Sequence, residues 1–384
     1  MRKNIENIDP IKITIPEELY YLFEQDAKNF EFFDYDAGKF VINKFLSALI
    51  VGYFPVYHRK IAGQYAEMKE ILSASIKDDK ELNAVISRLI RSRAMSESRT
   101  LERGKTRTVS IRPNSENDQT ITEINRTMRE TDETQAGFYR RMFDSYFTLP
   151  MYEREKLIYY KETEKIEKAC AAQREIKIMV SKTDRVRDHI VIPYKIVQGK
   201  DERFNYLLAQ EYNDYEARAK VVSFRLSRVS VLLETGSDER LDPLVLKHLK
   251  MTEAYSPQHS INDDNEILIE LTKEGLASYR SIYHNRPHCN SFDTTKDGKT
   301  IAHFCSSLDQ LFFYFRRFNP GEAVILNSDE LTNRLYVFHM KHAVNLGEQL
   351  GFIDDRESAS RDKVNLLMMG MIKDLRDYVN KHPK

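Results

Sequence analysis

The chain of 384 residues is short of cysteine and of long apolar runs. Its three cysteines, Cys170, Cys289 and Cys305, are scattered and odd in number, which excludes the disulfide framework of a small secreted domain. No apolar run approaches the roughly 20 residues that a membrane-spanning helix needs. The first residues, MRKNIENIDPIKI, lack the apolar core of a signal peptide. We therefore expect a cytoplasmic protein of about two to four domains, with no membrane segment.

Catalytic and metal-binding motifs are also missing. Both Gly-Lys-Thr triplets lack the upstream glycine of a phosphate-binding loop, and the chain has neither a nucleophile elbow nor an HExxH motif. His288, Cys289, His303 and Cys305 are zinc-ligand residue types, but their spacing matches no standard zinc finger. The sequence therefore predicts a protein that is not an enzyme and that has no cofactor and no metal.

Charge of one sign is not in excess either, because 59 basic residues balance 59 acidic ones. This balance excludes a histone-like polycation, so any binding of a polyanion must come from local patches. One such patch is the segment 88–112, in which the only acidic residues are Glu97 and Glu102. Its basic residues are Arg88, Arg91, Arg93, Arg99, Arg103, Lys105, Arg107 and Arg112. Two interpretations stay open, an exposed arm that neutralises phosphates and a plain solvated linker.

The first 54 residues have the pattern of one strand followed by two helices. Ile11, Ile13 and Ile15 alternate with polar residues, as in a strand with one buried face, and Pro16 then begins a helix. Apolar residues at helical spacing over 42–53 indicate a second helix. A lone strand cannot satisfy its own backbone groups, so we predict that it pairs with the strand of a second copy.

This pattern resembles the ribbon-helix-helix family, whose members are dimers. The resemblance implies a homodimer with Lys12 and Thr14 on the outside of the ribbon, where they enter the major groove of DNA. Lys12, Thr14 and Lys39 are the residues to test for this contact. The same 54 residues carry 6 basic and 9 acidic side chains, and a net negative unit repels phosphate. A second interpretation is therefore that the unit only dimerises.

Three extended runs follow in the middle of the chain. Ile190–Val197, Phe204–Glu211 and Val221–Leu233 are rich in β-branched and aromatic residues and are separated by Gly, Asp, Glu or Asn clusters. We predict that they form a compact antiparallel sheet or barrel.

Short motifs in these runs resemble those of the WYL-domain proteins of bacteria. They are Pro193-Tyr194, Asn205-Tyr206-Leu207 and Arg225-Leu226-Ser227-Arg228, with Asn205 where the family usually has Trp. The resemblance implies a small Sm-like β-barrel with a basic groove that engages nucleic acid or another anionic ligand through guanidinium groups and aromatic rings. The groove residues that we expect are His189, Tyr194, Lys195, Tyr206, Arg225 and Arg228.

Together these parts describe an α+β chain of four segments. The ribbon-helix-helix-like unit covers residues 1–54, and a helical linker that contains the basic segment covers 55–154. The WYL-like barrel covers 155–240, and an α/β extension of the kind that often follows a WYL module covers 241–384. The extension ends in a predicted terminal helix over 363–381.

This combination resembles the accessory proteins found beside type VI-D CRISPR ribonucleases. Proteins of that family bind single-stranded RNA and enhance the guided ribonuclease. The resemblance implies the same function here, with single-stranded RNA or DNA and an effector ribonuclease as partners. A DNA-binding transcriptional regulator whose WYL-like module senses a nucleic acid or an anionic ligand has the same pattern and is the alternative.

One spacing supports a third hypothesis. Four residues separate Arg334 from His339, a spacing that resembles the one that HEPN ribonucleases place on a helix. In that family His can act in acid-base catalysis and Arg can stabilise phosphate charge. A ribonuclease is therefore kept as the least favoured function.

Overall fold

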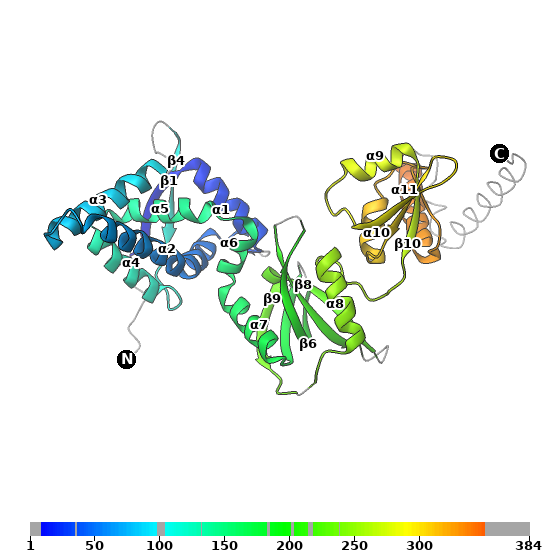
Figure 1. Ribbon diagram of the computed structural model, residues 1–384, viewed down its shortest axis with the longest axis horizontal. Helices are drawn as coiled ribbons and strands as arrows, with labels where there is room; N and C mark the ends of the chain where they lie inside the picture. Colours follow the sequence, from blue (N-terminus) through cyan, green and yellow to red (C-terminus); the bar gives the residue numbers. More distant parts are fainter. Residues whose placement is uncertain are drawn as a thin grey trace, which may run out of the picture. The chain divides into compact units, whose positions relative to one another are not determined.

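In a computed structural model the chain divides into two compact units, Met1–Asp263 and Asp264–Lys384 (Figure 1). The structure describes residues 9–349 except for 35–36, 98–103, 132, 183–184, 201–202, 214–217 and 238. The predicted terminal helix over 363–381 lies outside the described residues. Within the described ranges, no helix is both long enough and apolar enough to cross a bilayer.

The first part of unit 1 is a helical domain around a two-stranded ribbon. Its helices are α1 (Glu17–Asn29), α2 (Ile42–Leu72), α3 (Asp79–Glu97), α4 (Asp118–Thr131) and α5 (Gln135–Phe147). Its ribbon consists of β1 (Ile11–Pro16) and β4 (Thr106–Ile111), and β2 (Phe33–Asp34) pairs with β3 (Lys39–Phe40) between α1 and α2. One core holds the ribbon together with α1, α2, α4 and α5, and it is rich in aromatic residues such as Phe23, Phe45 and Phe143.

The partner of β1 is β4 of the same chain. The two strands are antiparallel, with Ile13 opposite Val109. The expectation that β1 needs the strand of a second copy is wrong, because residues 106–111, assigned to the helical linker from sequence, supply its hydrogen-bonding partner. Helices α1, α2 and α3 follow β1, and helices α4 and α5 follow β4. The ribbon is thus completed within one chain, and the predicted homodimer loses the observation on which it depended.

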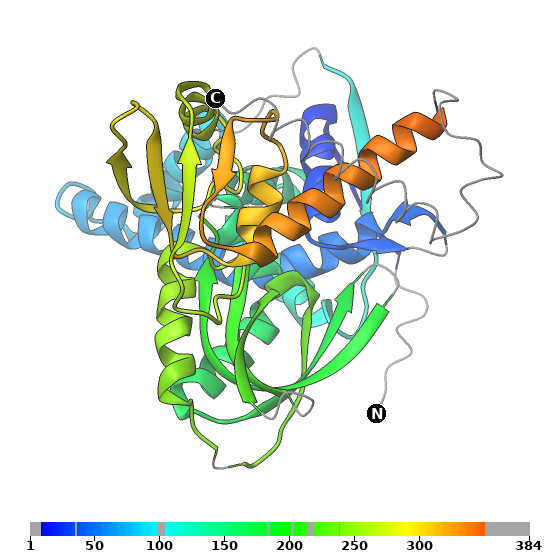
Figure 2. The ribbon, with the colours of Figure 1, turned by 90° about the vertical axis from the view of Figure 1, so that its right-hand side faces the viewer.

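The second part of unit 1 is a bent antiparallel sheet of five strands (Figure 2). The strands are β5 (Ile176–Lys182), β6 (Arg185–Gln198), β7 (Asn205–Asn213), β8 (Arg218–Arg225) and β9 (Val229–Glu234), in the order β8-β7-β6-β5-β9. Helix α7 (Tyr160–Ala172) packs against one face of the sheet, and α8 (Pro243–Tyr255) packs against the other.

The described part of the sheet does not close into the expected barrel. Strands β8 and β9 are its two edges, and the short 3-10 helix η2 (Leu226–Arg228) connects them without hydrogen bonds between the strands. The predicted strand Val221–Leu233 is thereby split into two strands on opposite edges. Sequence reasoning also missed β5, which lies before the first predicted run.

Helix α6 (Met151–Ile158) joins the helical domain to the sheet. The backbones of α2 and α6 approach so closely at Gly52 that a Cβ atom there would lie 1.9 Å from the carbonyl oxygen of Leu157. Arg154 of α6 also donates two hydrogen bonds, of 2.8 and 2.9 Å, to the buried carboxylate of Asp26 in α1. A bidentate pair of this kind fixes orientation as well as distance. These contacts hold α6 against the helical domain.

Unit 2 follows the β-α-β-β-α-β order of a ferredoxin-like fold. Its elements are β10 (Ile267–Leu271), α9 (Lys273–Ser281), β11 (Cys289–Thr294), β12 (Thr300–Phe304), α10 (Leu308–Phe315) and β13 (Ala323–Ile325), followed by α11 (Asp329–Gln349). The sheet order is β11-β12-β10-β13, and every pair is antiparallel. The apolar side chains at 267, 269 and 271 of β10 are buried, and the Thr272 hydroxyl caps α9 by accepting from Gly275 N. Because α8 packs on the sheet of unit 1, the unit boundary falls after Asp263, later than the predicted end at 240.

Candidate nucleic-acid interface

The inner face of the five-stranded sheet is the one on which side chains from all five strands form a common core. Side chains alternate between the faces along a strand, and directly opposed residues share a face. Ile178 and Val180 contribute to the inner face and lie opposite His189 and Arg187. Arg185, two residues earlier on β6, shares this face. The first half of β6 therefore places two arginines and a histidine in a row at the margin of the core.

Strands β7 and β8 complete this surface. Glu211 lies opposite Lys220 and shares the inner face with His189, whose Nδ1 atom lies 2.6 Å from Glu211 Oε1. The Lys220 Nζ atom lies 3.6 Å from Glu211 Oε2. Burial raises the pKa of Glu211, but the His189 hydrogen bond and the nearby His189 and Lys220 charges lower this pKa below its ordinary value overall. The ring of Phe224 lies 4.8 Å from that of His189, so an aromatic pair flanks the row.

We call the surface formed by Arg185, Arg187, His189, Lys220 and Phe224 the inner basic surface. Arg185 and Arg187 are exposed, and neither forms an ion pair with a carboxylate in the described part of the chain. Guanidinium groups bind phosphate and flat rings stack on bases, so the surface has the chemistry of a single-strand site. Sequence reasoning selected only His189 of these five, because the predicted strand began at Ile190. The alternation of Arg, Arg and His at 185, 187 and 189 was the available signal.

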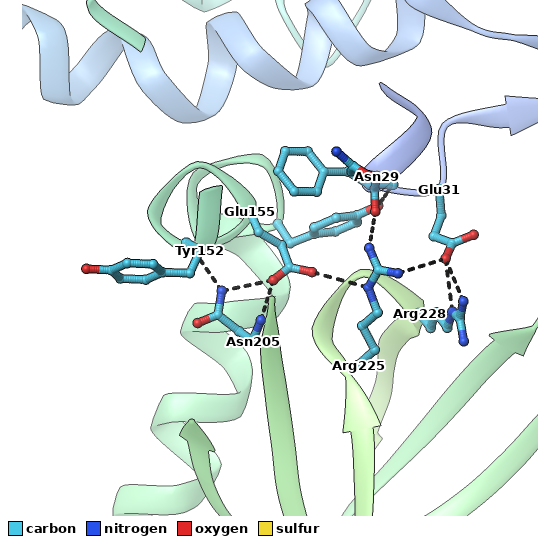
Figure 3. A network of polar contacts seen from close by, with 9 residues as sticks. Asn29, Glu31, Tyr152, Glu155, Asn205, Arg225 and Arg228 are labelled. Carbon is cyan, nitrogen blue, oxygen red and sulfur yellow. Dashed lines mark hydrogen bonds and ion pairs between the residues drawn. The ribbon is translucent and has the colours of Figure 1, made fainter. Parts of the chain in front are cut away.

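The two predicted arginines of the groove lie elsewhere, beside the helical domain (Figure 3). Residues 225 and 228 would face opposite sides of a regular strand, but η2 turns the chain between them and both guanidinium groups meet Glu31, just after α1. Glu31 Oε1 lies 2.8 and 3.0 Å from Arg228 and 3.5 Å from Arg225. Arg225 also donates to the carbonyl of Asn29 and lies over the Phe204 ring, 3.5 Å from its centroid. Both predicted arginines are therefore engaged by groups of the same chain.

Behind Arg225 lies the buried carboxylate of Glu155, from α6 (Figure 3). Asn205 donates to Glu155 Oε2 from its backbone nitrogen at 2.6 Å and from its side chain at 2.9 Å, and it also donates to the carbonyl of Tyr152. Burial raises the pKa of Glu155 to about 6, although Asn205 and Arg225 favour the ionised form. Asn205, which replaces the usual Trp of the resembled motif, thus anchors a buried acid.

The other predicted groove residues contact a second carboxylate. The Tyr194 hydroxyl donates to Glu253 of α8 at 2.9 Å, and Lys195 Nζ lies 2.6 Å from the same carboxylate. A register shift between Pro193 and Lys195 explains why these neighbours reach one acid. Tyr206 lies opposite Arg225. The six residues therefore do not form one groove. His189 belongs to the inner basic surface, Tyr194 and Lys195 to the contact with α8, and Tyr206, Arg225 and Arg228 to the side near the helical domain.

The N-terminal candidates are also divided. Lys12 and Thr14 are exposed on the outside of the β1–β4 ribbon, as the alternation predicts. Lys39 lies on β3, at the other end of α1. Because a helix of 13 residues is about 20 Å long, Lys39 is not part of the same ribbon surface.

The basic segment 88–112 is not a single arm. Arg88 is on α3, and Arg107 is on β4. Arg107 Nη2 lies 3.0 Å from Glu17, and its guanidinium lies 4.7 Å from the centroid of the Tyr20 ring. Arg103 and the side chains of Arg91 and Arg93 lie outside the described residues. Arg107 is thus a structural partner of helix α1.

The spacing of Arg334 and His339 does not produce a shared site on α11. Arg334 pairs with Asp309 at 2.5 Å and lies over Phe312, whereas His339 is exposed. This placement argues against the ribonuclease hypothesis.

Among the comparisons with known proteins, one solved structure shows a shared fold. No protein-family model matches the chain, and no curated protein matches it. The crystal structure of a CRISPR Cas-related protein is similar over 91% of this chain and 97% of that chain, with 19% sequence identity and a TM-score of 0.61. The proteasome accessory factor B/C of Arthrobacter aurescens is aligned over 61% of this chain and 36% of that chain at 17% identity, but its TM-score of 0.21 supports no argument. The first likeness shows a shared fold that includes both units.

Proposed function

We propose that the chain is a non-catalytic accessory protein that binds single-stranded RNA on the inner basic surface and enhances an RNA-guided CRISPR ribonuclease. The observation that carries the proposal is the row of Arg185, Arg187 and His189 beside Phe224. Alternate residues of a strand are about 7 Å apart, so the row offers regularly spaced partners for successive phosphates. The aromatic pair offers a stacking face for a base.

The chemistry of the surface favours a single strand over a duplex. An extended strand can place its phosphates along β6 and turn its bases toward the His189 and Phe224 rings, whereas the bases of a duplex are stacked on one another inside the helix. Phosphate contacts carry no sequence information, so we expect little base specificity and a strong dependence on salt.

The setting of a CRISPR system is supported by the fold shared with a CRISPR Cas-related protein across nearly the whole of both chains. The proposal that the chain itself does not catalyse cleavage is supported by the placement of Arg334 and His339, the one catalytic spacing that the sequence offers. An accessory role then assigns the chemistry to the partner ribonuclease.

Fluorescence anisotropy with labelled single-stranded RNA, single-stranded DNA and duplex DNA, over a series of salt concentrations, tests the binding. We expect the double variant Arg187→Ala, Lys220→Ala to weaken single-strand binding and to reduce the salt slope by about 0.7 for each phosphate contact that is lost. The matched control is Arg174→Ala, Lys168→Ala, because these exposed cations pair with Glu234 and Glu164 away from the inner basic surface. Equal binding by the two double variants would contradict the proposed site.

Enhancement is tested separately. Adding the chain to a type VI-D CRISPR ribonuclease is expected to raise the rate of guided RNA cleavage, and the Arg187→Ala, Lys220→Ala variant is expected to raise it less. The chain alone is expected to leave RNA intact with magnesium or manganese present. RNA cleavage by the chain alone that disappears in His339→Ala would instead support a ribonuclease.

A DNA-binding regulator is the second candidate function, and the β1–β4 ribbon favours it. The ribbon presents Lys12, Thr14 and Thr108 on its exposed side, and polar side chains on a two-stranded ribbon suit the major groove. This function predicts binding to duplex DNA that is lost in Lys12→Ala and unaffected by the Arg187→Ala, Lys220→Ala variant. The opposite dependence would exclude it.

A further inference from the structure

We propose that Glu31 is an internal competitor that occupies a phosphate site formed by Arg225 and Arg228, so that a bound single strand displaces it. The inference rests on the proposed function, because the phosphate would belong to single-stranded RNA. It adds a regulated second contact to the one on the inner basic surface.

The site that Glu31 fills is built for an oxyanion. Two guanidinium groups from η2 and the end of β8 converge on one carboxylate oxygen (Figure 3). The Arg225 guanidinium also lies over the face of the Phe204 ring. Guanidinium pairs are suited to phosphate, which presents more oxygen atoms than a carboxylate does. The side chains of Arg228 and Glu31 are 30% and 25% exposed, so a strand in solution can reach this ion pair.

Arg225 has a second arrangement available. Its Nε atom lies 3.9 Å from Glu155 Oε1, too far for a hydrogen bond, and neither atom has another hydrogen-bond partner in the described part of the chain. A shift of about 1 Å would join them at an ordinary hydrogen-bond distance. When Glu31 leaves, Arg225 can therefore pair through Nε with Glu155 and still present Nη1 to a phosphate, which lowers the cost of the displacement.

Displacement of Glu31 is a local change. Glu31 follows the end of α1 and has a φ of 61°, a left-handed conformation that a residue with a side chain adopts at some energetic cost. Helix α1 itself stays attached to α6 through the buried pair of Asp26 and Arg154. The carboxylate can therefore move away without release of the helix that precedes it.

These features give the order of events. A phosphate approaches the more exposed Arg228, repels the Glu31 carboxylate and takes its place between the two guanidinium groups, while the Nε atom of Arg225 closes onto Glu155. Without nucleic acid, Glu31 neutralises the two arginines and limits binding of other anions. The contact of Glu31 with Arg225 and Arg228 is thus autoinhibitory. It makes the binding free energy of a single strand less favourable by the free energy needed to break the contact.

Glu31→Gln tests the inference, because it removes the charge and keeps the shape and the backbone conformation. We expect labelled single-stranded RNA to bind this variant about tenfold more tightly than the natural chain, as for the loss of one charged competitor. The salt slope should become steeper by about 0.7 for each phosphate newly bound. Glu18→Gln is the matched control, because Glu18 is an exposed acid of the same helix region, distant in sequence from the arginine contacts.

The outcomes separate this inference from the proposed function. Tighter binding by Glu31→Gln that returns to the natural level when Arg225→Ala and Arg228→Ala are added supports the internal competitor. Equal binding by the Glu31→Gln and Glu18→Gln variants overturns it, while the natural chain can still bind through Arg187 and Lys220. Absence of single-strand binding in the natural chain and in both variants overturns the proposed function and the inference together. Thermal unfolding of each variant checks that the fold is retained.

Discussion

Two pairs of arginines, one on β6 and the other at the end of β8 and in η2, have opposite surroundings. Arg185 and Arg187 lie on the inner face of β6 and form no ion pair in the described part of the chain. Arg225 and Arg228 meet Glu31, which is 194 and 197 positions away in the sequence. The pair that belongs to the motif resembling the WYL family, Arg225 and Arg228, is therefore the pair that a carboxylate of the same chain already contacts. The comparison teaches that a basic motif identifies a chemical capability, whereas distant carboxylates decide whether that capability is free.

The largest effect on stability is expected from disrupting the contact between α2 and α6, because α6 carries Glu155, which lies behind Arg225. Gly52→Ala would place a Cβ atom 1.9 Å from Leu157 O and force α6, which carries Glu155, away from α2. We expect a loss of about 3 kcal/mol or more in the free energy of unfolding, measured with urea. Gly63→Ala in the same helix is the control, because its Cβ would meet no atom within 4 Å. Replacing that glycine should stabilise the chain by up to about 1 kcal/mol, and similar losses in both variants would contradict the close approach.

The next largest effect is a difference in stability between a variant of each arginine pair. Arg225→Ala leaves Glu155 buried without its cation, so we expect the free energy of unfolding to fall by about 2 to 3 kcal/mol. Arg187→Ala removes an exposed cation and is expected to change this free energy by less than about 0.5 kcal/mol. Urea unfolding of both variants at neutral pH measures the difference. Equal losses would contradict the buried contact of Arg225 with Glu155 and the exposed position of Arg187.

The pH dependence of stability isolates Glu155. Its pKa is raised to about 6 in the folded chain from an ordinary value of 4.5, so the folded chain binds the proton more tightly than the unfolded chain does. Stability should therefore increase as the pH falls from about 6 toward 4.5, by about 2 kcal/mol from this group, and this gain is absent above that range. Glu155→Gln should flatten this part of the curve measured by urea unfolding, whereas Glu18→Gln should leave it unchanged. An identical slope in the natural chain and in Glu155→Gln would contradict the assignment.

The smallest effect concerns the open pair. Arg187→Ala alone is expected to weaken single-strand binding at physiological salt about fourfold, as for one lost phosphate contact. Arg228→Ala should change binding less in the natural chain, because Glu31 already occupies that guanidinium. Anisotropy titrations with one labelled single-stranded RNA measure both. A larger effect of Arg228→Ala than of Arg187→Ala would show that single strands bind mainly at the arginines predicted from the sequence and not at the inner basic surface.

Local patterns predicted much of the secondary structure and the cations that a site needs. The alternation of Ile11, Ile13 and Ile15 predicted β1, and Pro16 predicted the start of α1. The partner of β1 was not predictable in the same way, because three helices separate β4 from β1 and β4 lies in a segment rich in arginine and threonine. The homodimer was predicted because no partner for β1 was recognised in the sequence. It stays a prediction, and light scattering can test it by measuring the mass of the protein in solution.

The sequence by itself determined the α+β elements, the absence of a disulfide framework and the residue types that can bind phosphate. These features depend on neighbours within a few positions, which the chain order displays directly. The tertiary structure decided which of the cations are available. Glu31, Glu155 and Glu253 reach Arg225, Arg228 and Lys195 only after folding brings α1, α6 and α8 against the sheet. Coulomb attraction depends on distance in space, so no local pattern can report it.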